Sequence, residues 1–514
     1  MNSQIETRQA RRYREKKLPT TVRSTWASAI CRNPFWGSFF LGVLGFLISF
    51  AGSWVPSPWL DEVATAHIAS YPIGDMAALW QHTDAVFAPY YVFMNVWLTF
   101  TGISPFWLRL PSLLAVGAGT AAMAAAGHAV GGPKKQVLYA ACFALLPRVT
   151  AMGVEARPYA LSAMFMAFAL LAVLQLRRKN SVWYWLLLGL SMVGTVSAHL
   201  FSALGVVGLI AVALILFPRK SRLALLVVSM MAGVACLPLA IAAMPQQSQV
   251  SWIADSTPNL VDQALVEAWF TTRWNVNPSG TEIPLHYIAV ALAVLAGLTV
   301  AMAVTAGRPL PKDRLAIAAI PPTVAVGILW TISLVQEPML LGRYLTSSAP
   351  FIAMLLAECL VLLRPHVKRL MASLLVVGCV LLIVAQRQPY AKLPANDYSF
   401  VASVVHNQAR AGDGLLLEPG LGLTDSARGA MATYPQEFNR LVDIVQPQKA
   451  PLAFVFPADP PLADITQTVL PSRVWLITKV QQESNYGDQL RSVGYEPKSS
   501  SSGPGHTVTL WTQP

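Results

Sequence analysis

The sequence predicts an α-helical polytopic membrane protein with about eleven transmembrane helices and a C-terminal α/β domain outside the cytoplasm. Of its 514 residues, 54% are hydrophobic and only 12% are charged, about half the charged fraction of ordinary soluble domains. Apolar runs of about 17 to 25 residues recur, and each is long enough to cross the hydrocarbon core of a bilayer. These runs end near residue 386, after which the composition becomes that of a soluble domain.

The N-terminal segment 1–34 is a basic tail, and the first apolar run, 39–54, follows it. This run is too long for a cleaved signal peptide, so we expect it to be retained as the first span. Basic residues before a span favour a cytoplasmic N-terminus. The next segment, 56–109, is then an outer loop, in which recurring Trp and Tyr residues indicate a pair of helices at the headgroup level.

The other spans follow one another with short turns between most of them. We expect them at 110–130, 137–152, 159–176, 183–198, 201–217, 223–244, 287–306, 315–335, 345–363 and 370–385. Lys and Arg gather in every second turn, which marks those turns as cytoplasmic and places the C-terminus outside. The same clusters account for the net charge of +12 as contacts with anionic membrane lipids, with no nucleic-acid partner.

The transmembrane domain is thus 35–386, and 387–514 is a soluble domain that mixes helices and strands. Helices are expected at 397–410 and 481–493, and a Ser-rich loop at 499–503. Strands are expected at 415–417, 452–456, 473–478 and 507–511. The five cysteines lie in or beside apolar runs without metal-ligand spacing, so neither a disulfide framework nor a cysteine metal site is expected.

Two adjacent carboxylates, Asp61 and Glu62, directly follow the first span. An acidic residue at the edge of the hydrocarbon is costly unless it faces a polar cavity, so this pair is the first candidate site. The alternative is a solvated loop in which Asp61 caps the next helix.

Further polar residues fall at the same, outer ends of the predicted spans. They are His67, Asp84, Glu155, Arg157, His199, Arg273, Glu337 and Arg343. Carboxylates mixed with arginines suit a substrate that carries both hydroxyls and a phosphate, since Arg binds phosphate with two parallel hydrogen bonds. For sugar transfer from a lipid phosphate, Asp61 is the candidate base and Arg157 and Arg343 are the candidate phosphate ligands.

Each of these assignments has a simpler structural alternative. Glu155 and Arg157 can form a surface ion pair, Arg343 can be an interfacial anchor, and His199 can be a polar residue in a helix turn. Outer Trp residues such as Trp252 and Trp274 are anchors or platforms for a sugar ring. A divalent cation is possible at Asp61, Glu62 and Asp84, although their spacing is not diagnostic.

Several short motifs, taken in their order along the chain, resemble the GT-C glycosyltransferases. They are Leu60-Asp61-Glu62, the segment 84–91 with Pro89-Tyr90-Tyr91, Leu108-Arg109-Leu110-Pro111-Ser112, Glu155-Ala156-Arg157-Pro158-Tyr159 and Gly342-Arg343-Tyr344-Leu345. Within that superfamily, the chain is similar to the branch that uses polyprenyl-phosphate sugars, which includes protein O-mannosyltransferases and aminoarabinose transferases. It resembles actinobacterial membrane mannosyltransferases in particular.

The resemblance implies inverting transfer of a sugar, mannose in the leading hypothesis, from a polyprenyl-phosphate donor to an extracytoplasmic glycan, lipid or protein acceptor. It implies that Asp61 is the catalytic base, with Glu62 beside it. Arg157, Arg343 and His199 would bind the donor phosphate. Glu155, Asp84, His67 and Tyr91 would contact the substrate.

The chain departs from the family pattern at Phe87-Ala88-Pro89, where aminoarabinose transferases carry a lysine before the proline. That departure disfavours aminoarabinose as the sugar. The alternative function is a transporter or flippase of a lipid-linked sugar, which performs no chemistry. A transporter needs polar residues through the full depth of its spans, whereas this chain concentrates them at one face.

Overall fold

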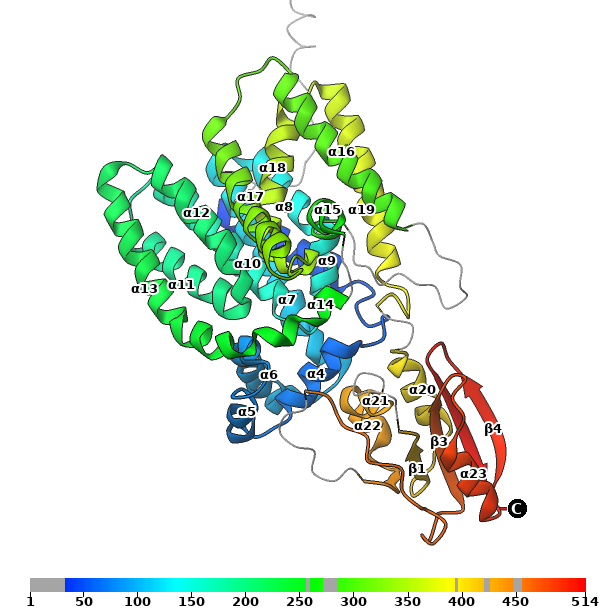
Figure 1. Ribbon diagram of the computed structural model, residues 1–514. Coiled ribbons are helices and arrows are strands. Elements are labelled where there is room, and N and C mark those ends of the chain that lie inside the picture. Colours follow the sequence, from blue (N-terminus) through cyan, green and yellow to red (C-terminus); the bar gives the residue numbers. More distant parts are fainter. Residues whose placement is uncertain (1–32, 256–258, 271–284, 393–395, 420–425, 447–454) are drawn as a thin grey trace, which may run out of the picture.

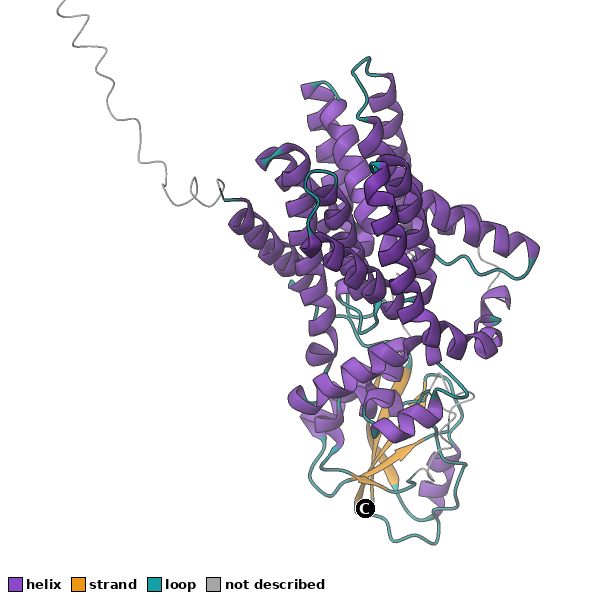
Figure 2. Cartoon of the chain, turned by 90° about the vertical axis from the view of Figure 1, so that its left-hand side faces the viewer, coloured by secondary structure: helices purple, strands orange, loops and turns teal. Residues whose placement is uncertain are grey.

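The computed structural model describes residues 33–255, 259–270, 285–392, 396–419, 426–446 and 455–514. The chain is an α-helical polytopic membrane protein, in which the helices pack into one body and a small sheet lies at one end of it (Figures 1 and 2). In the described part, seven helices are long and apolar enough to span a membrane, and a bent pair, Pro133–Ala144 with Pro147–Gly153, forms an eighth candidate.

All of the predicted spans have helical counterparts. They are α3 (Pro34–Phe50), the pair α8 (Pro133–Ala144) and α9 (Pro147–Gly153), α7 (Pro105–Gly131), α10 (Tyr159–Leu176), α11 (Val182–Ala198), α12 (Ala203–Leu216), α13 (Arg219–Ala243), α16 (Leu285–Thr305), α17 (Lys312–Val335), α18 (Ala349–Leu362) and α19 (Pro365–Ala385). Three apolar stretches, Pro34–Phe50, Val182–Ala198 and Leu200–Leu216, are shorter than the seven spanning candidates. The predicted fold class is therefore confirmed.

Proline residues fix where many of these helices begin. Pro34, Pro105, Pro133, Pro147 and Pro365 each stand in the first turn of a helix, where the missing N–H has no helical partner to lose. Between α8 and α9 the chain bends by 63°. The chain therefore changes direction before Gly153, and the turn that holds Glu155 and Arg157 follows.

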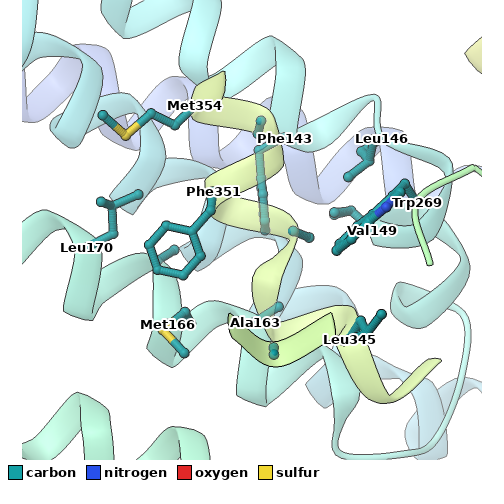
Figure 3. Packing of buried hydrophobic residues seen from close by; sticks show 14 of the residues in the cluster. Phe143, Leu146, Val149, Ala163, Met166, Leu170, Trp269, Leu345, Phe351 and Met354 are labelled. Atoms are coloured by element: carbon teal, nitrogen blue, oxygen red, sulfur yellow. The ribbon is translucent and has the colours of Figure 1, made fainter. Parts of the chain in front are cut away.

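The packed centre of the helical body is apolar. Figure 3 shows Phe143, Leu170, Phe351 and Met354 interlocked there, and all four are fully buried. In water, burial of such side chains drives packing. In a bilayer the lipid tails are apolar too, so helix association depends on close van der Waals contact between the helices. Small residues permit that contact: at Gly127 of α7, an added Cβ would lie 2.3 Å from the backbone oxygen of Lys135.

The predicted outer loop contains short helices. They are α4 (Leu60–Ala69), α5 (Ile73–Leu79), the 3-10 turn η1 (Ala85–Phe87) and α6 (Ala88–Thr101). The two interfacial helices predicted in this loop match α4 and α6, and α5 is additional. A second group of short elements follows α13. They are η3 (Met244–Val250), α14 (Trp252–Asp255), α15 (Leu260–Asp262) and the π-helical turn η4 (Gln263–Glu267). The 3-10 turns η2 (Leu200–Ser202) and η5 (Gly342–Ser348) precede α12 and α18.

The C-terminal region holds one five-stranded sheet with the order β2-β1-β3-β5-β4. Its strands are β1 (Gly414–Leu417), β2 (Val442–Asp443), β3 (Arg473–Lys479), β4 (Glu496–Ser502) and β5 (His506–Thr512). β2, β1 and β3 are parallel, whereas β5 and β4 are antiparallel to their neighbours. Its helices are α20 (Tyr398–Gln408), α21 (Arg428–Thr433), α22 (Pro435–Phe438) and α23 (Asn485–Ser492).

Most elements predicted in this region are present. One prediction is wrong, and another falls mostly on residues that the structure does not describe. The predicted Ser-rich loop at 499–503 is wrong, because residues up to Ser502 form the edge strand β4. There the hydroxyls of Ser500 and Ser502 lie 3.0 Å from those of Thr509 and Thr507 on β5, and such cross-strand pairs stabilise a sheet. Most of the strand predicted at 452–456 lies outside the described residues.

The sheet region lies against α4 and the segment before it. Val63 of α4 belongs to the same apolar cluster as Val401 and Trp475. The amide of Leu60 donates to Asn396 Oδ1 at 3.2 Å, and the amide of Ser57 donates to the carbonyl of Pro389 at 2.7 Å. The start of α4, which carries Asp61, is thus held from the C-terminal side.

Candidate active site

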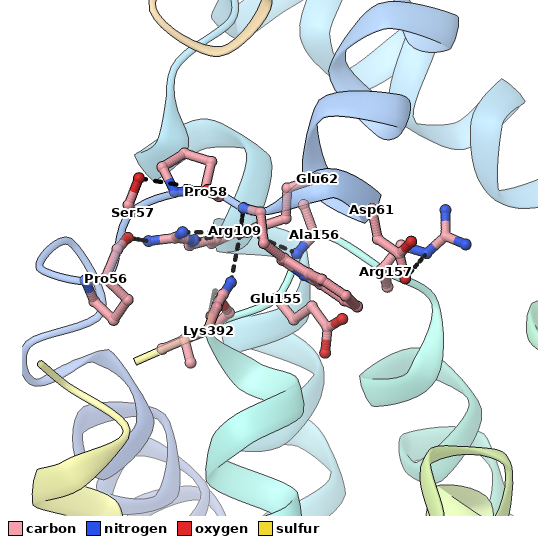
Figure 4. Close-up of polar contacts among 12 residues, drawn as sticks. Pro56, Ser57, Pro58, Asp61, Glu62, Arg109, Glu155, Ala156, Arg157 and Lys392 are labelled. Carbon is pink, nitrogen blue, oxygen red and sulfur yellow. Dashed lines mark hydrogen bonds and ion pairs between the residues drawn. The ribbon is translucent and has the colours of Figure 1, made fainter. Parts of the chain in front are cut away.

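The structure brings Asp61 together with both arginines predicted to act with it. Asp61 Oδ2 lies 3.5 Å from Arg157 Nε and 3.6 Å from Arg343 Nη1. Figure 4 shows Asp61 and Arg157 facing each other beside Glu155. The three residues are 96 and 186 positions apart along the chain, so only the tertiary fold makes them neighbours.

Each of the three comes from the beginning of a helical element. Asp61 stands in the first turn of α4, whose N-cap is Trp59, so Asp61 is not itself the cap. Arg157 lies in the turn between α9 and α10. Only Pro158, the N-cap of α10, separates it from the helix. Arg343 lies in η5, just before α18. The three side chains of the cluster thus come from the starts of elements that are far apart in the sequence.

Aromatic side chains hold the two guanidinium groups. Arg157 lies 4.1 Å over the ring of Phe87, and Arg343 lies within 5.3 to 5.8 Å of the rings of Trp252, Trp59 and Tyr344. Arginine stacks well on such rings. Within the described residues, the buried Nε atoms of both arginines make no hydrogen bond, so the cluster holds donor capacity that Asp61 alone does not use.

A second carboxylate reaches the same cluster through a tyrosine. The Tyr91 hydroxyl donates to Asp84 Oδ2 at 2.7 Å and accepts from Arg157 Nη1 at 3.1 Å. Asp84 has a left-handed backbone with φ of 55°, a conformation that Asp tolerates better than most residues. Burial raises the pKa of Asp84, against the opposing charge of Arg157. Asp84, Tyr91, Arg157 and Asp61 thus form one connected chain.

Glu62, by contrast, has all of its acceptor capacity in use. It is 1% exposed and receives Arg109 Nε at 2.8 Å and Arg109 Nη2 at 2.9 Å, together with Lys392 Nζ. The backbone amides of Trp59 and Ala156 also donate to it. Although burial alone would raise its pKa, the charges of Arg109 and Lys392 lower the pKa to about 2. The geometry gives Glu62 a structural place behind the site, in contrast to the catalytic role predicted beside Asp61.

Two residues of this network were not predicted as site residues. Arg109 belongs to α7 and also donates to the carbonyls of Ser53 and Pro56, so it ties the first span to the second. Lys392 follows α19 and also donates to the carbonyl of Val154 at 2.8 Å. A buried arginine at the edge of an apolar run was a sequence signal for Arg109, whereas nothing local marks Lys392.

Glu155 and His199 border the same cluster. In the described structure, no hydrogen bond to the Glu155 carboxylate is found, and burial raises its pKa despite the nearby charge of Lys392. The ring of His199 lies 5.3 Å from those of Tyr159 and Tyr344. Burial, together with the charges of Arg343 and Arg157, lowers the pKa of His199 to about 3, so it is a neutral hydrogen-bonding group at neutral pH.

His67 lies further from the cluster than predicted. It is six residues beyond Asp61 on α4, about 9 Å along the helix axis. Its Nε2 is 2.7 Å from the hydroxyl of Tyr71, and burial lowers its pKa to about 4. These contacts make His67 a packing partner of Tyr71, and they give it no link to the arginines.

Metal ligation is possible at a different place from the one considered in the sequence. Since Glu62 is saturated by cations, the set Asp61, Glu62 and Asp84 is not a metal site. Elsewhere in the described residues, Asp262, Glu267 and His286 offer ligand atoms within 4.8 Å of one another. Arg148 Nη2, however, lies 4.0 Å from Glu267 Oε2, and its positive charge opposes a divalent cation there.

Solved structures share this fold. ArnT from Cupriavidus metallidurans bound to undecaprenyl phosphate matches with a TM-score of 0.52 and 11% identity over 92% of this chain and 97% of that chain. Its apo state matches with a TM-score of 0.50 and 10% identity over the same shares. The archaeal oligosaccharyltransferase AglB from Archaeoglobus fulgidus gives 0.44 and 12% over 72% and 58%. No family model and no curated protein sequence matches. The chain therefore has the fold of the GT-C membrane glycosyltransferases.

Proposed function

We propose that the protein transfers a sugar from a polyprenyl-phosphate carrier to an acceptor outside the cytoplasm, with inversion at the anomeric carbon. The observation that carries this proposal is the convergence of Asp61, Arg157 and Arg343 at one face of the helical body. ArnT, which shares the fold, has been captured with undecaprenyl phosphate, and this supports a polyprenyl phosphate as the carrier. Mannose is the proposed sugar, and the acceptor is an envelope glycan, lipid or protein.

The donor phosphate would lie between Arg157 and Arg343. Their aromatic contacts preorient both guanidinium planes. The Nε of Arg343 makes no hydrogen bond among the described residues, and that of Arg157 faces Asp61 at 3.5 Å, so both can donate to phosphate oxygens once the phosphate replaces Asp61. As the sugar–phosphate bond breaks, negative charge grows on the leaving phosphate, and fixed cations stabilise it without reorganising. Neutral His199, which borders the cluster, would donate a further hydrogen bond to the phosphate.

Asp61 would then act as the base. A phosphate taken up by the two arginines replaces the carboxylate as their main counter-ion, so Asp61 becomes available to accept a proton. The acceptor hydroxyl oxygen forms a bond to the anomeric carbon, its proton passes to Asp61, and the bond from that carbon to the phosphate oxygen breaks. The proton thus ends on Asp61, and the leaving phosphate stays between Arg157 and Arg343.

Glu155, Asp84 and Tyr91 are proposed to orient the sugar. Glu155 has a raised pKa and a carboxyl group without a hydrogen bond among the described residues, so in its neutral form it can both donate to and accept from a sugar hydroxyl. Tyr91 holds Arg157 in register with Asp84. Glu62, Arg109 and Lys392 position the start of α4, and the region 387–514 is proposed to be an outer domain that supports this position.

The decisive experiment measures transfer by the purified full-length protein from labelled polyprenyl-phosphate mannose to an envelope acceptor fraction. Asp61→Asn should lower the transfer rate by about 10²- to 10⁴-fold, the usual contribution of a general base, while donor binding persists. Asp75→Asn is the matched control, because Asp75 is an exposed carboxylate on the neighbouring helix α5. It should transfer at the wild-type rate.

The same assay separates this proposal from passive transport. Arg157→Gln should weaken donor binding, because it removes one of the two proposed phosphate ligands. Transfer by Asp61→Asn at the wild-type rate would exclude Asp61 as the base. If the reconstituted protein moves the lipid-linked sugar from one leaflet of the vesicle membrane to the other and forms no transfer product, it is a transporter.

A further inference from the structure

A basic cavity lies at the opposite end of the membrane-spanning helices from Asp61. Its volume is about 450 Å³, and four cationic side chains line it, Arg177, Arg178, Lys312 and Arg314, against a single carboxylate, Asp313. The cavity therefore carries a positive charge. None of its residues takes part in the proposed transfer reaction.

The length of α10 indicates where this cavity lies across the bilayer. Arg157 of the candidate active site stands just before this helix, and Arg177 follows its last residue. A helix of 18 residues is about 27 Å long, close to the thickness of the hydrocarbon core, about 30 Å. The active-site cluster and the basic cavity thus lie at the two boundaries of the bilayer, and the cavity is at the level of lipid head groups.

Two of the cationic side chains of the cavity, Arg314 and Arg178, are held by contacts with the protein. Arg314 Nε lies 3.1 Å from Glu358 Oε2, and Glu358, itself 1% exposed, also accepts from Tyr139. Arg178 Nη1 donates to the carbonyl of Ala129 at 2.8 Å. The guanidinium groups are therefore in place before any ligand arrives, which lowers the entropy lost on binding.

The walls of the cavity are of two kinds. Ala129, Val130 and Leu174 form an apolar part, and the arginines form a part that suits oxyanions, because guanidinium binds phosphate with paired hydrogen bonds. A soluble phosphate would use the cations alone. A phospholipid would use both parts, the phosphodiester at the cations and the glycerol and acyl carbons along the apolar wall.

We propose that this cavity binds the head group of an anionic phospholipid from the leaflet opposite to the active site. Basic pockets between membrane helices at this depth suit such head groups. The lipid would connect the ends of α7, α10 and α17, whose residues line the cavity. Binding would stabilise that end of the helical body, independently of sugar transfer.

The test measures retention of added phosphatidylglycerol by the purified full-length protein in native mass spectrometry, with phosphatidylcholine as the neutral lipid. The variant is Arg178→Gln with Lys312→Gln, which leaves the ion pairs of Arg177 and Arg314 intact. A basic residue near a bilayer surface contributes about 1 kcal/mol, so losing two should weaken binding about 25-fold. Arg219→Gln with Lys220→Gln is the matched control, because both residues are exposed and do not line the cavity.

The outcomes are distinct. Selective loss of phosphatidylglycerol in the cavity variant, with the control variant unchanged, supports the site. An equal loss in both variants would show unspecific attraction to basic turns and would overturn it. Inorganic phosphate that binds the wild type and displaces the lipid would make the cavity a soluble-anion site, which also overturns the lipid assignment. Wild-type melting behaviour of the variant without lipid shows that it folds.

Discussion

Replacing Glu62 by glutamine should destabilise the protein by roughly 3 kcal/mol at neutral pH. The reason is the buried network in which Glu62 neutralises Arg109 and Lys392. Its pKa falls from an ordinary 4.5 to about 2, and one pKa unit corresponds to about 1.4 kcal/mol, so the network stabilises the folded state by roughly 3 kcal/mol. Removing one partner of a buried ion pair costs about 3 to 5 kcal/mol, which agrees.

The pH dependence follows from the same shift. Because the folded pKa of Glu62 lies below its unfolded pKa, the unfolded chain takes up the proton first as the solution is acidified. The stabilisation is therefore complete above pH 4.5 and is lost as the pH falls towards 2. The difference in melting temperature between the wild type and Glu62→Gln should be several degrees at pH 7 and should narrow through this window.

Glu155→Gln is the control for this measurement. Its carboxylate is also buried near Asp61, but burial raises its pKa, so its charge destabilises the folded state at neutral pH. Thermal unfolding in detergent, followed by tryptophan fluorescence, should show Glu155→Gln to be at least as stable as the wild type. A Glu62→Gln protein that melts with the wild type, or a Glu155→Gln protein that loses as much as Glu62→Gln, would refute the reasoning.

Two further changes test other parts of the structure. Tyr91→Phe removes the hydroxyl that accepts from Arg157 and donates to Asp84. A buried hydrogen bond to a charged group contributes about 1.5 to 3 kcal/mol, so the free energy of unfolding should fall by about that amount. Transfer should fall as well, because Arg157 loses the group that orients it, and an unchanged rate would deny Tyr91 its role. Gly127→Ala would place a Cβ 2.3 Å from the backbone of Lys135 and should cost about 1 to 3 kcal/mol of stability. Gly233→Ala meets no atom within 4 Å and should be neutral or stabilising, so equal melting of the two glycine variants would contradict the packing of α7 on α8.

The candidate site was predictable in part because its residues share one side of the membrane. Once the spans are placed, Asp61, Arg157 and Arg343 all fall at outer helix ends, and a bilayer leaves few positions where such groups can gather. Their distances could not be read from the sequence. Asp61 and Glu62 leave the first turn of α4 in different directions. Asp61 meets Arg157 and Arg343, whereas Glu62 meets Arg109 and Lys392.

The sequence by itself determined the membrane spans, since the length of an apolar run and the position of a proline act locally against a bilayer of fixed thickness. After residue 396 it also predicted α20, β1, β3, α23 and β5, but not α21, α22, β2 or β4. The serines of β4 become a strand only beside β5. Only the tertiary structure decided that Lys392 neutralises Glu62, because these residues are separated by 330 positions. Long-range pairing of this kind depends on how the helices pack against one another, which no local pattern encodes.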